Sequence, residues 1–258
     1  MNINVERGID ILQKEWIEKC NECGGTGYLE DRLCDCMKRF QTGVKLLLGE
    51  FPLDLVRLEK PVCDDKILVF YRDNPDKVFE NGLSLYIHGP LGVGKTLCSV
   101  WLSEEFVSAF GPEGQCGYKH DLTVQFMEAS NFVLRSRISG GDDKELKKFY
   151  KTFDASLFVL DDFNNEYKSA QNPQYVHRLY EMFLRHRLSN CLPTIITTNV
   201  PPQQVSAEYD VKIASLLGIK QKKSGYDMAG RFVEIRLDGP DWRKLANDRA
   251  WSDFFKEE

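Results

Sequence analysis

The sequence predicts an α/β protein with a central parallel sheet flanked by helices, and three observations favour this class. An apolar strand over residues 83–88 leads directly into a glycine-rich turn and then into a helical pattern. Residues 157–160 are apolar without a break, as expected of a strand buried on both faces in a parallel sheet. Polar side chains follow this strand and the one at 193–198, at the edge where ligands bind in such sheets.

The composition of the whole chain indicates what kind of protein it is. Its 258 residues can bury one core with a small appendage, and 42% apolar residues are typical of a soluble globular protein. The net charge of −5 excludes a general basic field, so any nucleic acid must be contacted by a local patch or by several subunits together. The sequence shows neither a signal-peptide pattern nor a membrane-spanning apolar run. We therefore expect a cytoplasmic protein without membrane contact, whose eight cysteines are reduced.

A cysteine-rich segment follows a weak helical pattern over residues 8–19. Its close pairs, Cys20 with Cys23 and Cys34 with Cys36, would complete a tetrahedral site, which favours Zn²⁺. A segment this short has too little core to fold alone, and a structural metal would supply the missing stability. Four reduced thiols without metal and an iron–sulfur cluster are the alternatives.

Turn residues at 49–52 predict a domain boundary. We expect a Cys-rich module for metal and partner binding over residues 1–50, and a second domain over residues 51–258. Residues 53–82 carry no chemical motif and are expected to be helical, with a break at Asn74–Pro75.

The strand at 83–88 alternates apolar and polar residues, which predicts one buried face. The turn after it reads Gly89-Pro90-Leu91-Gly92-Val93-Gly94-Lys95-Thr96-Leu97, the pattern of a phosphate-binding P-loop. Its glycines let backbone N–H groups turn toward a polyphosphate. Lys95 would reach the β- and γ-phosphates, and the Thr96 hydroxyl would ligate Mg²⁺. A nucleotide-binding protein is the interpretation that this strand–turn–helix context favours over a stray glycine-rich turn.

Between the P-loop and the next motif, the pattern predicts a helix, a strand and two further helices. Their ranges are 97–110, 120–127, 130–139 with Ser130 as N-cap, and 142–153.

The strand at 157–160 ends in Asp161 and Asp162, the pattern of a Walker B motif. We expect Asp161 to hold the Mg²⁺ shell and Asp162 to orient or deprotonate the attacking water. A later strand ends at Asn199, whose amide would lie beside Asp162 and the γ-phosphate. Turn-forming acids and a β-turn asparagine are the plainer alternatives. The last third holds a basic run, a strand over 232–237 and Gly239-Pro-Asp-Trp-Arg243.

With these motifs in order, the chain resembles the AAA+ ATPases of the DnaC/DnaI helicase-loader group and their transposition relative IstB. The likeness covers about residues 51–245 and rests on five segments: 89–96, 157–162, Arg187 six positions before Pro193, 194–199 and 239–243. The cysteine-rich start also resembles the zinc-bearing N-terminal module of DnaI-type loaders. The resemblance implies an AAA+ fold that binds ATP and Mg²⁺.

The resemblance also implies roles residue by residue. Walker A roles fall to Lys95 and Thr96, Walker B roles to Asp161 and Asp162, sensor 1 to Asn199 and sensor 2 to Arg243. Ser215-Leu216-Leu217 lacks the arginine of the family's Ser-Arg-Leu. The arginine finger, which acts on the ATP of a neighbouring subunit, is therefore assigned to Arg231, which stands twelve residues before Arg243, about the family's interval. Ordinary surface salt bridging is the alternative for Arg231 and Arg243. The pair of aspartates replaces the usual Asp–Glu, so we expect slow hydrolysis that DNA or a partner stimulates.

Loaders of this kind form ATP-dependent open spirals around single-stranded DNA. The resemblance therefore implies self-association, single-stranded DNA and a DnaB-type replicative helicase as partners. Tyr175 falls on a family tyrosine and would stack on a base, while Arg135, Arg137 and the lysines at 220–223 would face phosphates. A packing tyrosine and a solvated charged face are the alternative.

An ATP-dependent helicase loader is thus the expected function. An IstB-like helper ATPase that acts with a transposase on duplex DNA is the alternative, although such chains usually begin with a helical segment rather than a CxxC pair. A small-molecule kinase is disfavoured because Asn199 and the C-terminal arginines look like sensors.

Overall fold

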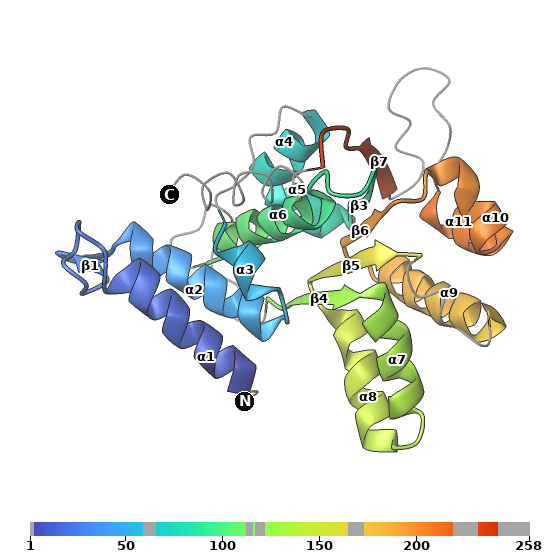
Figure 1. The fold of residues 1–258 in the computed structure, drawn as a ribbon, viewed down its shortest axis with the longest axis horizontal. Coiled ribbons are helices and arrows are strands. Elements are labelled where there is room, and N and C mark those ends of the chain that lie inside the picture. Colours follow the sequence, from blue (N-terminus) through green and yellow to red (C-terminus); the bar gives the residue numbers. More distant parts are fainter. Residues whose placement is uncertain are drawn as a thin grey trace, which may run out of the picture.

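The structure, a computed structural model, describes residues 3–58, 66–111, 116, 122–164, 173–218 and 232–241. Within these residues a five-stranded sheet forms the centre, in the order β4-β5-β6-β3-β7, and every neighbouring pair is parallel (Figure 1). Its strands are β3 (Ser84–His88), β4 (Val124–Glu128), β5 (Leu157–Phe163), β6 (Thr194–Thr198) and β7 (Phe232–Arg236). The predicted α/β class with a parallel sheet flanked by helices is confirmed.

Strand β3 lies between β6 and β7, and all five of its residues are buried. The prediction of a single buried face is wrong here, because helices cover both faces of the sheet at this strand. The alternation was misleading because polar side chains can be buried when they find partners. The Tyr86 hydroxyl donates to the carbonyl oxygen of Val200 at 2.8 Å, and His88 Nε2 lies 2.9 Å from a carboxylate oxygen of Glu234.

One face of the sheet packs against a core that includes Leu85, Ile87 and the α6 side chains Trp101 and Phe106. The helices on this side are α4 (Lys66–Asp73), α5 (Pro75–Asn81) and α6 (Lys95–Ala109), together with the N-terminal helices described below. Helix α4 ends at Asp73 and α5 begins at Pro75, so the predicted break is confirmed.

The other face carries an aromatic core centred on Phe132. Its ring centroid lies 5.1–5.7 Å from those of Phe149, Phe153, Tyr180 and Phe183. The elements on this side are α7 (Ala129–Ser139), α8 (Asp143–Lys151), η2 (Thr152–Asp154), α9 (Pro173–Ser189), η4 (Pro202–Gln204), α10 (Val205–Glu208) and α11 (Val211–Leu217). In Figure 1, α7 and α8 form a hairpin that projects away from the sheet.

The starts of α7 and α8 differ in how they are capped. Helix α7 begins at Ala129 after Glu128 in extended conformation, so the predicted N-cap at Ser130 is wrong. Helix α8 follows Asp142, whose carboxylate accepts a hydrogen bond from the Lys144 N–H at 2.8 Å. This is the normal arrangement of an aspartate N-cap.

The N-terminal region is a helical pair that carries a small hairpin at one end (Figure 1). It comprises α1 (Ile3–Leu12), the π-helical turn η1 (Gln13–Ile17), the antiparallel strands β1 (Tyr28–Leu29) and β2 (Arg32–Leu33), and α2 (Asp35–Leu48). Gly43 of α2 permits close contact with the first helix, since a Cβ there would lie 2.7 Å from the Trp16 ring and 2.8 Å from Leu12. The Arg39 guanidinium stacks 4.3 Å from the centre of that ring.

Helix α2 ends in a turn that attaches it to the edge of the sheet. The N–H groups of Glu50 and Phe51 bond to the carbonyls of Leu47 and Leu46, a Schellman arrangement with Glu50 at φ +66°. Gly49 itself lies against β4, because a Cβ there would come within 2.3 Å of the Val124 carbonyl oxygen. The left-handed position therefore falls on a glutamate, and the glycine is used for close approach. The short helix α3 (Leu53–Val56) follows.

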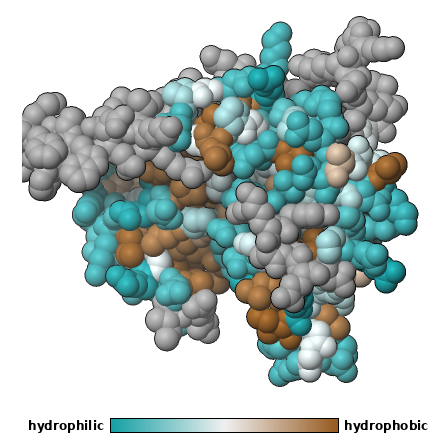
Figure 2. All heavy atoms as spheres, turned by 45° about the vertical axis from the view of Figure 1, so that its right-hand side comes forward, coloured by the Kyte–Doolittle hydropathy of each residue, from teal (hydrophilic) through white to brown (hydrophobic). Residues whose placement is uncertain are grey.

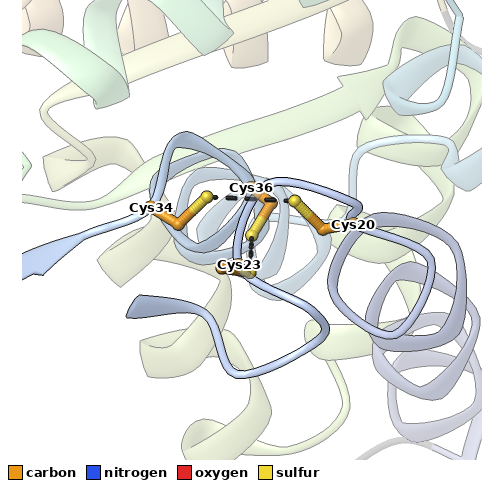
Figure 3. A group of neighbouring side chains, drawn as sticks. All are labelled: Cys20, Cys23, Cys34 and Cys36. Atoms are coloured by element: carbon orange, nitrogen blue, oxygen red, sulfur yellow. Dashed lines mark hydrogen bonds between the residues drawn. The ribbon is translucent and has the colours of Figure 1, made fainter. Parts of the chain in front are cut away.

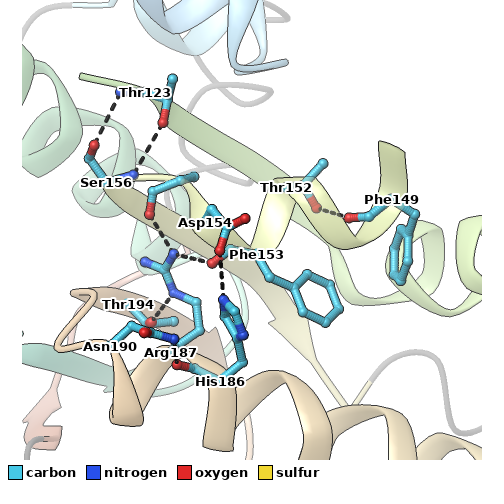
Figure 4. Close-up of polar contacts among 11 residues, drawn as sticks. Thr123, Phe149, Thr152, Phe153, Asp154, Ser156, His186, Arg187, Asn190 and Thr194 are labelled. Carbon is cyan, nitrogen blue, oxygen red and sulfur yellow. Dashed lines mark hydrogen bonds and ion pairs between the residues drawn. The ribbon is translucent and has the colours of Figure 1, made fainter. Parts of the chain in front are cut away.

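A buried arginine joins α9 to the starts of β5 and β6 (Figure 4). Arg187 is 1% exposed, and its guanidinium donates to the Thr194 hydroxyl at 2.9 Å and to the carbonyls of Phe153, Ala155 and Pro193. Each of the three guanidinium nitrogens donates to at least one acceptor, as a buried charged group requires. Arg187, one of the residues that carry the sequence resemblance, therefore has a structural role in this fold.

The coloured part of the surface in Figure 2 is more hydrophilic than apolar, with apolar patches between the polar side chains. Among the described residues, Leu134 and Ile138 of α7 and Leu58 and Leu91 are exposed large apolar side chains. In the part of the chain that the structure describes, no helix combines the length and apolar character needed to cross a membrane.

Candidate functional site

A pocket of about 740 Å³ opens at the carboxyl ends of the central strands. It is lined by segments that are distant in the sequence: Pro52, Asp54, Leu55, Leu58, Leu91, Gly92, Gly94, Lys95, Thr96, Leu97, Phe126, Glu128, Asp161, Asp162, Thr197 and Asn199. The structure thus brings the predicted P-loop, both aspartates and Asn199 to one place. Such an edge is where open parallel sheets bind ligands.

The P-loop connects β3 to the first turn of α6, and its glycines allow close contacts. A Cβ on Gly89 would lie 2.0 Å from the carbonyl oxygen of Leu237, just after β7. Gly92 has φ +77°, and a Cβ there would lie 1.8 Å from Oδ1 of Asp241. The chain after β7 therefore packs closely against the loop. The first residues of α6 line the pocket, and a helix N-terminus favours a bound anion.

Lys95 is buried at the start of α6. Its Nζ donates to the carbonyls of Gly89 and Pro90 at 3.0 and 2.7 Å, and to Oδ1 of Asn199 at 2.7 Å. The ammonium thus lies inside the loop and in contact with the predicted sensor. A triphosphate oxygen would be a stronger, charged acceptor for the same group.

Asp161 is buried between two hydroxyl donors. Thr197 donates to Oδ1 at 2.5 Å and Thr96 donates to Oδ2 at 3.1 Å. Burial raises the pKa of Asp161 to about 6; the two hydroxyls work against this increase, and the nearby Asp162 and Glu128 carboxylates add to it. A carboxylate and a threonine hydroxyl in contact form an oxygen-rich pair of the kind that holds Mg²⁺. These two residues fit the ion that the sequence analysis assigned to them.

Asp162 stands in a bulge at the end of β5. The register with β6 pairs Leu160 with Ile196 and then Phe163 with Thr198, so two aspartates oppose a single residue. Asp162 has φ +54°, and its N–H donates to the Thr197 hydroxyl at 3.0 Å. Bulges beside active sites re-aim side chains, and here the bulge directs two consecutive residues to the same pocket.

Two groups of lining residues were missed by the sequence analysis. Thr197 holds both aspartates, yet in the sequence it is one β-branched residue among several in a strand. The wall formed by Pro52, Leu55 and Leu58 belongs to a segment that carries no motif. Only the spatial position of α3 beside the P-loop reveals it, since no residue type or spacing there indicates ligand binding.

Several predicted residues lie outside the described part of the chain. These are Arg231, Arg243 and the lysines at 220–223. The arginine finger, sensor 2 and the basic run therefore stay predictions from sequence. Asp241 is described, and its contact with Gly92 places the start of the sensor 2 segment against the P-loop.

The four N-terminal cysteines form a compact cluster, with their side chains directed toward one another (Figure 3). All four Sγ atoms lie within 4.8 Å of one another; Cys20 and Cys34 are 3.9 Å apart, and Cys23 and Cys36 are 3.5 Å apart. Zn–S bonds of about 2.3 Å in a tetrahedron place sulfurs about 3.8 Å apart. The cluster could therefore hold a zinc ion. All four cysteines are free of disulfides.

The protonation of the cluster favours one thiolate over the others. Burial works to raise the pKa of Cys23, but hydrogen bonds, led by the Gly27 N–H at 3.2 Å, outweigh it and lower the pKa to about 6. Burial and the neighbouring thiols raise the pKa of Cys36. A cation would release these protons together, since thiolates are the metal ligands.

The predicted DNA-binding residues separate into two places. The Tyr175 hydroxyl is hydrogen-bonded to that of Ser136, and the Arg137 guanidinium lies 5.7 Å from the Tyr175 ring. Tyr175 and Arg137 thus form one patch between α7 and α9. Arg135 instead pairs with Glu50 at 2.7 Å, at the end of α2.

Solved structures of other proteins share this fold. The structure of DnaI aligns with a TM-score of 0.52 and 19% identity, over 74% of this chain and 93% of that one. A DnaC helicase loader gives 0.51 and 18%, over 69% and 93%. A putative primosome component from Streptococcus pyogenes serotype M3 gives 0.50 and 13%, over 73% and 90%. No protein-family model and no curated protein matches the sequence.

These structural neighbours are AAA+ replication proteins, and the AAA+ fold that the resemblance implied is confirmed. At identities below 20% the likeness establishes the fold, and the activity has to be argued from the pocket and the cysteine cluster.

Proposed function

From the AAA+ fold shared with the DnaI and DnaC structures, we propose that this chain is an ATP-dependent loader of a DnaB-type replicative helicase. The single observation that carries the proposal is the pocket that joins Lys95, Thr96, Asp161 and Asn199, on a chain that also bears the four-cysteine cluster. The pocket would bind ATP and hydrolyse it slowly. The cluster would organise a module that contacts the helicase.

The contacts suggest a role for each residue in the pocket. Lys95 would exchange the loop carbonyls for β- and γ-phosphate oxygens, while keeping its contact with Asn199. Thr96 and Asp161 would hold Mg²⁺, which neutralises charge on the phosphates when bound. Asp162, turned toward the pocket by the bulge, would orient the attacking water. Arg231 and Arg243 are proposed to complete the site, Arg231 from a neighbouring subunit in an ATP-dependent oligomer.

A test of nucleotide binding uses Lys95→Ala, with Lys151→Ala as the matched control because Lys151 is an exposed lysine on α8. Titration with a fluorescent ATP analogue and Mg²⁺ should show affinity reduced roughly 10- to 100-fold for Lys95→Ala, the loss expected for a charged hydrogen-bond donor. Lys151→Ala should bind like the wild type. Equal affinity of both variants would contradict the P-loop assignment.

A test of hydrolysis uses Asp162→Asn. If Asp162 positions or deprotonates the water, phosphate release should fall about 100-fold or more, while ATP binding is retained. Asp76→Asn, an exposed aspartate at the start of α5, is the control. Unchanged turnover of Asp162→Asn would assign the water to another group.

We propose single-stranded DNA as the ligand of the patch formed by Tyr175 and Arg137. The ring would stack on a base and the guanidinium would contact phosphate. Tyr175→Ala and Arg137→Gln should each weaken binding of an oligonucleotide, and Arg137→Gln should also reduce the salt dependence. Arg185→Gln, at an exposed pair with Glu181, is the control. Tighter binding of duplex than of single-stranded DNA would favour the IstB-like alternative.

Association with the helicase is tested on the full chain. Mixed with the replicative helicase of its source and ATP, the protein should co-elute as a complex in size-exclusion chromatography. Cys20→Ser combined with Cys23→Ser should lose both the zinc and the complex, if the module is the contact. The absence of any complex with the wild-type protein under ATP would refute the loader proposal.

A further inference from the structure

One wall of the pocket, formed by Pro52, Leu55 and Leu58, directly continues the chain of the N-terminal helices. Pro52, Leu55 and Leu58 line the pocket, and they lie four, seven and ten residues after the last residue of α2, Leu48. The four-cysteine cluster lies at the other end of this helix, with Cys34 at its N-cap and Cys36 in its first turn. A 14-residue helix, about 21 Å long, thus has a metal site at one end and the pocket wall at the other.

The N-terminal helices are connected to the pocket first through the turn after α2. The Gly49 carbonyl accepts hydrogen bonds from the Phe126 N–H at 2.7 Å and from the Gln125 side chain at 3.2 Å. The Phe51 ring packs 5.3 Å from the Phe126 ring, and Phe126 itself lines the pocket. A change in the position of α2 would therefore move both the wall and the strand beside it.

The second contact is an ion pair that bypasses α2. Glu15, in the π-helical turn next to the cysteine segment, accepts two hydrogen bonds from the Arg57 guanidinium, one of them from Nε at 2.7 Å. Arg57 directly precedes Leu58, which lines the pocket. Bidentate pairs of this kind fix orientation as well as distance.

We propose that the four-cysteine metal site and the nucleotide pocket are thermodynamically coupled through α2 and the Glu15–Arg57 pair. Metal at the cysteines fixes the helical pair, and the helical pair fixes the wall from Pro52 to Leu58 against which the nucleotide packs. This inference rests on the nucleotide binding proposed above. Metal should strengthen nucleotide binding, and nucleotide should strengthen metal binding by the same factor, because linkage is reciprocal.

The experiment measures both directions on the full chain. The dissociation constant of a fluorescent ATP analogue is determined for the Zn²⁺-loaded and the chelator-treated protein, with circular dichroism as the control for folding. We expect metal removal to weaken nucleotide binding about fivefold or more. Added ATP should strengthen Zn²⁺ binding, measured by competition with a chromophoric chelator, by the same factor.

A variant at Arg57 tests the Glu15–Arg57 pair without altering the cysteines. Arg57→Gln, loaded with Zn²⁺, should bind nucleotide more weakly than the wild type, and its affinity should depend less on metal. Arg185→Gln, which breaks the exposed Glu181 pair on α9, should keep the wild-type coupling. This variant keeps the proposal testable even if the metal-free protein unfolds.

The possible outcomes distinguish a failure of nucleotide binding from a failure of its coupling to the metal site. If neither form binds nucleotide, the proposed function fails and the coupling fails with it. If nucleotide binds but its affinity is the same with and without metal, and the same in Arg57→Gln, the coupling is wrong while the nucleotide site stands. A protein that takes up no Zn²⁺ would overturn the coupling in the same way.

Discussion

At the scale of single residues, the site depends on one threonine and one bulge. Thr197 donates to Asp161 and accepts from the N–H of Asp162, so a single hydroxyl positions both aspartates. The left-handed backbone of Asp162 costs about 1 kcal/mol or more and is held by the pairing of β5 with β6. The sequence indicated which aspartates lie in the site. It contained no sign of the bulge, which arises from contacts between strands distant in sequence.

The buried Asp161 predicts an unusual dependence of stability on pH. Burial raises its pKa from 3.8 to about 6, so between these values the folded protein retains a proton that the unfolded chain loses. Without Mg²⁺ and nucleotide, this residue should lower the free energy of unfolding as pH rises from about 4 to about 6. The shift corresponds to roughly 3 kcal/mol.

Asp161→Asn removes this titration. In urea unfolding without metal or nucleotide, the variant should exceed the wild type by up to roughly 3 kcal/mol at about pH 8, and the difference should vanish near pH 4. Asp76→Asn should follow the wild-type curve at both pH values, because its side chain is exposed. Equal stability of Asp161→Asn and wild type at the higher pH would show that the carboxylate is better solvated than its burial indicates.

At the scale of elements, local patterns identified most strands and helices but not their surroundings. The continuous apolar run of β5 predicted a strand buried on both faces, and it is one. The same reasoning failed for β3, because its polar residues are buried through partners on other strands, such as Glu234 for His88. The helix boundary at Asn74 was predictable because proline acts locally.

Among the contacts between elements, those of Arg187 are expected to have the largest effect on the free energy of unfolding. Arg187→Lys keeps the charge, but a single ammonium cannot bond to Thr194 and to the three carbonyls that the guanidinium now reaches. Buried acceptors left without partners cost about 1–3 kcal/mol each. We expect the free energy of unfolding, measured in urea, to fall by about 3 kcal/mol. Arg185→Lys, on the same helix and exposed, should change it little, and a similar loss in both variants would contradict this role.

At the scale of the whole molecule, the Cys-rich region and the sheet share one core. The sequence placed a domain boundary at residue 50 from turn residues, and that division stays a prediction. The packing places Leu46 of α2 in the same core as Phe51 and Trp101. A local pattern cannot reveal such a shared core, because Leu46 and Trp101 are more than fifty residues apart in the sequence.

The hydrogen bond from Phe126 to the Gly49 carbonyl has a consequence for solubility. Strand β4 stands at the border of the sheet, and unpaired strand borders recruit other chains into aggregates. A chain that starts at residue 51 would lose that acceptor and uncover the apolar surface that Leu46 now fills. We expect light scattering to show this shortened protein associating at concentrations where the full chain stays dispersed. The turn that attaches the N-terminal helices would thus also protect the sheet from other copies of itself.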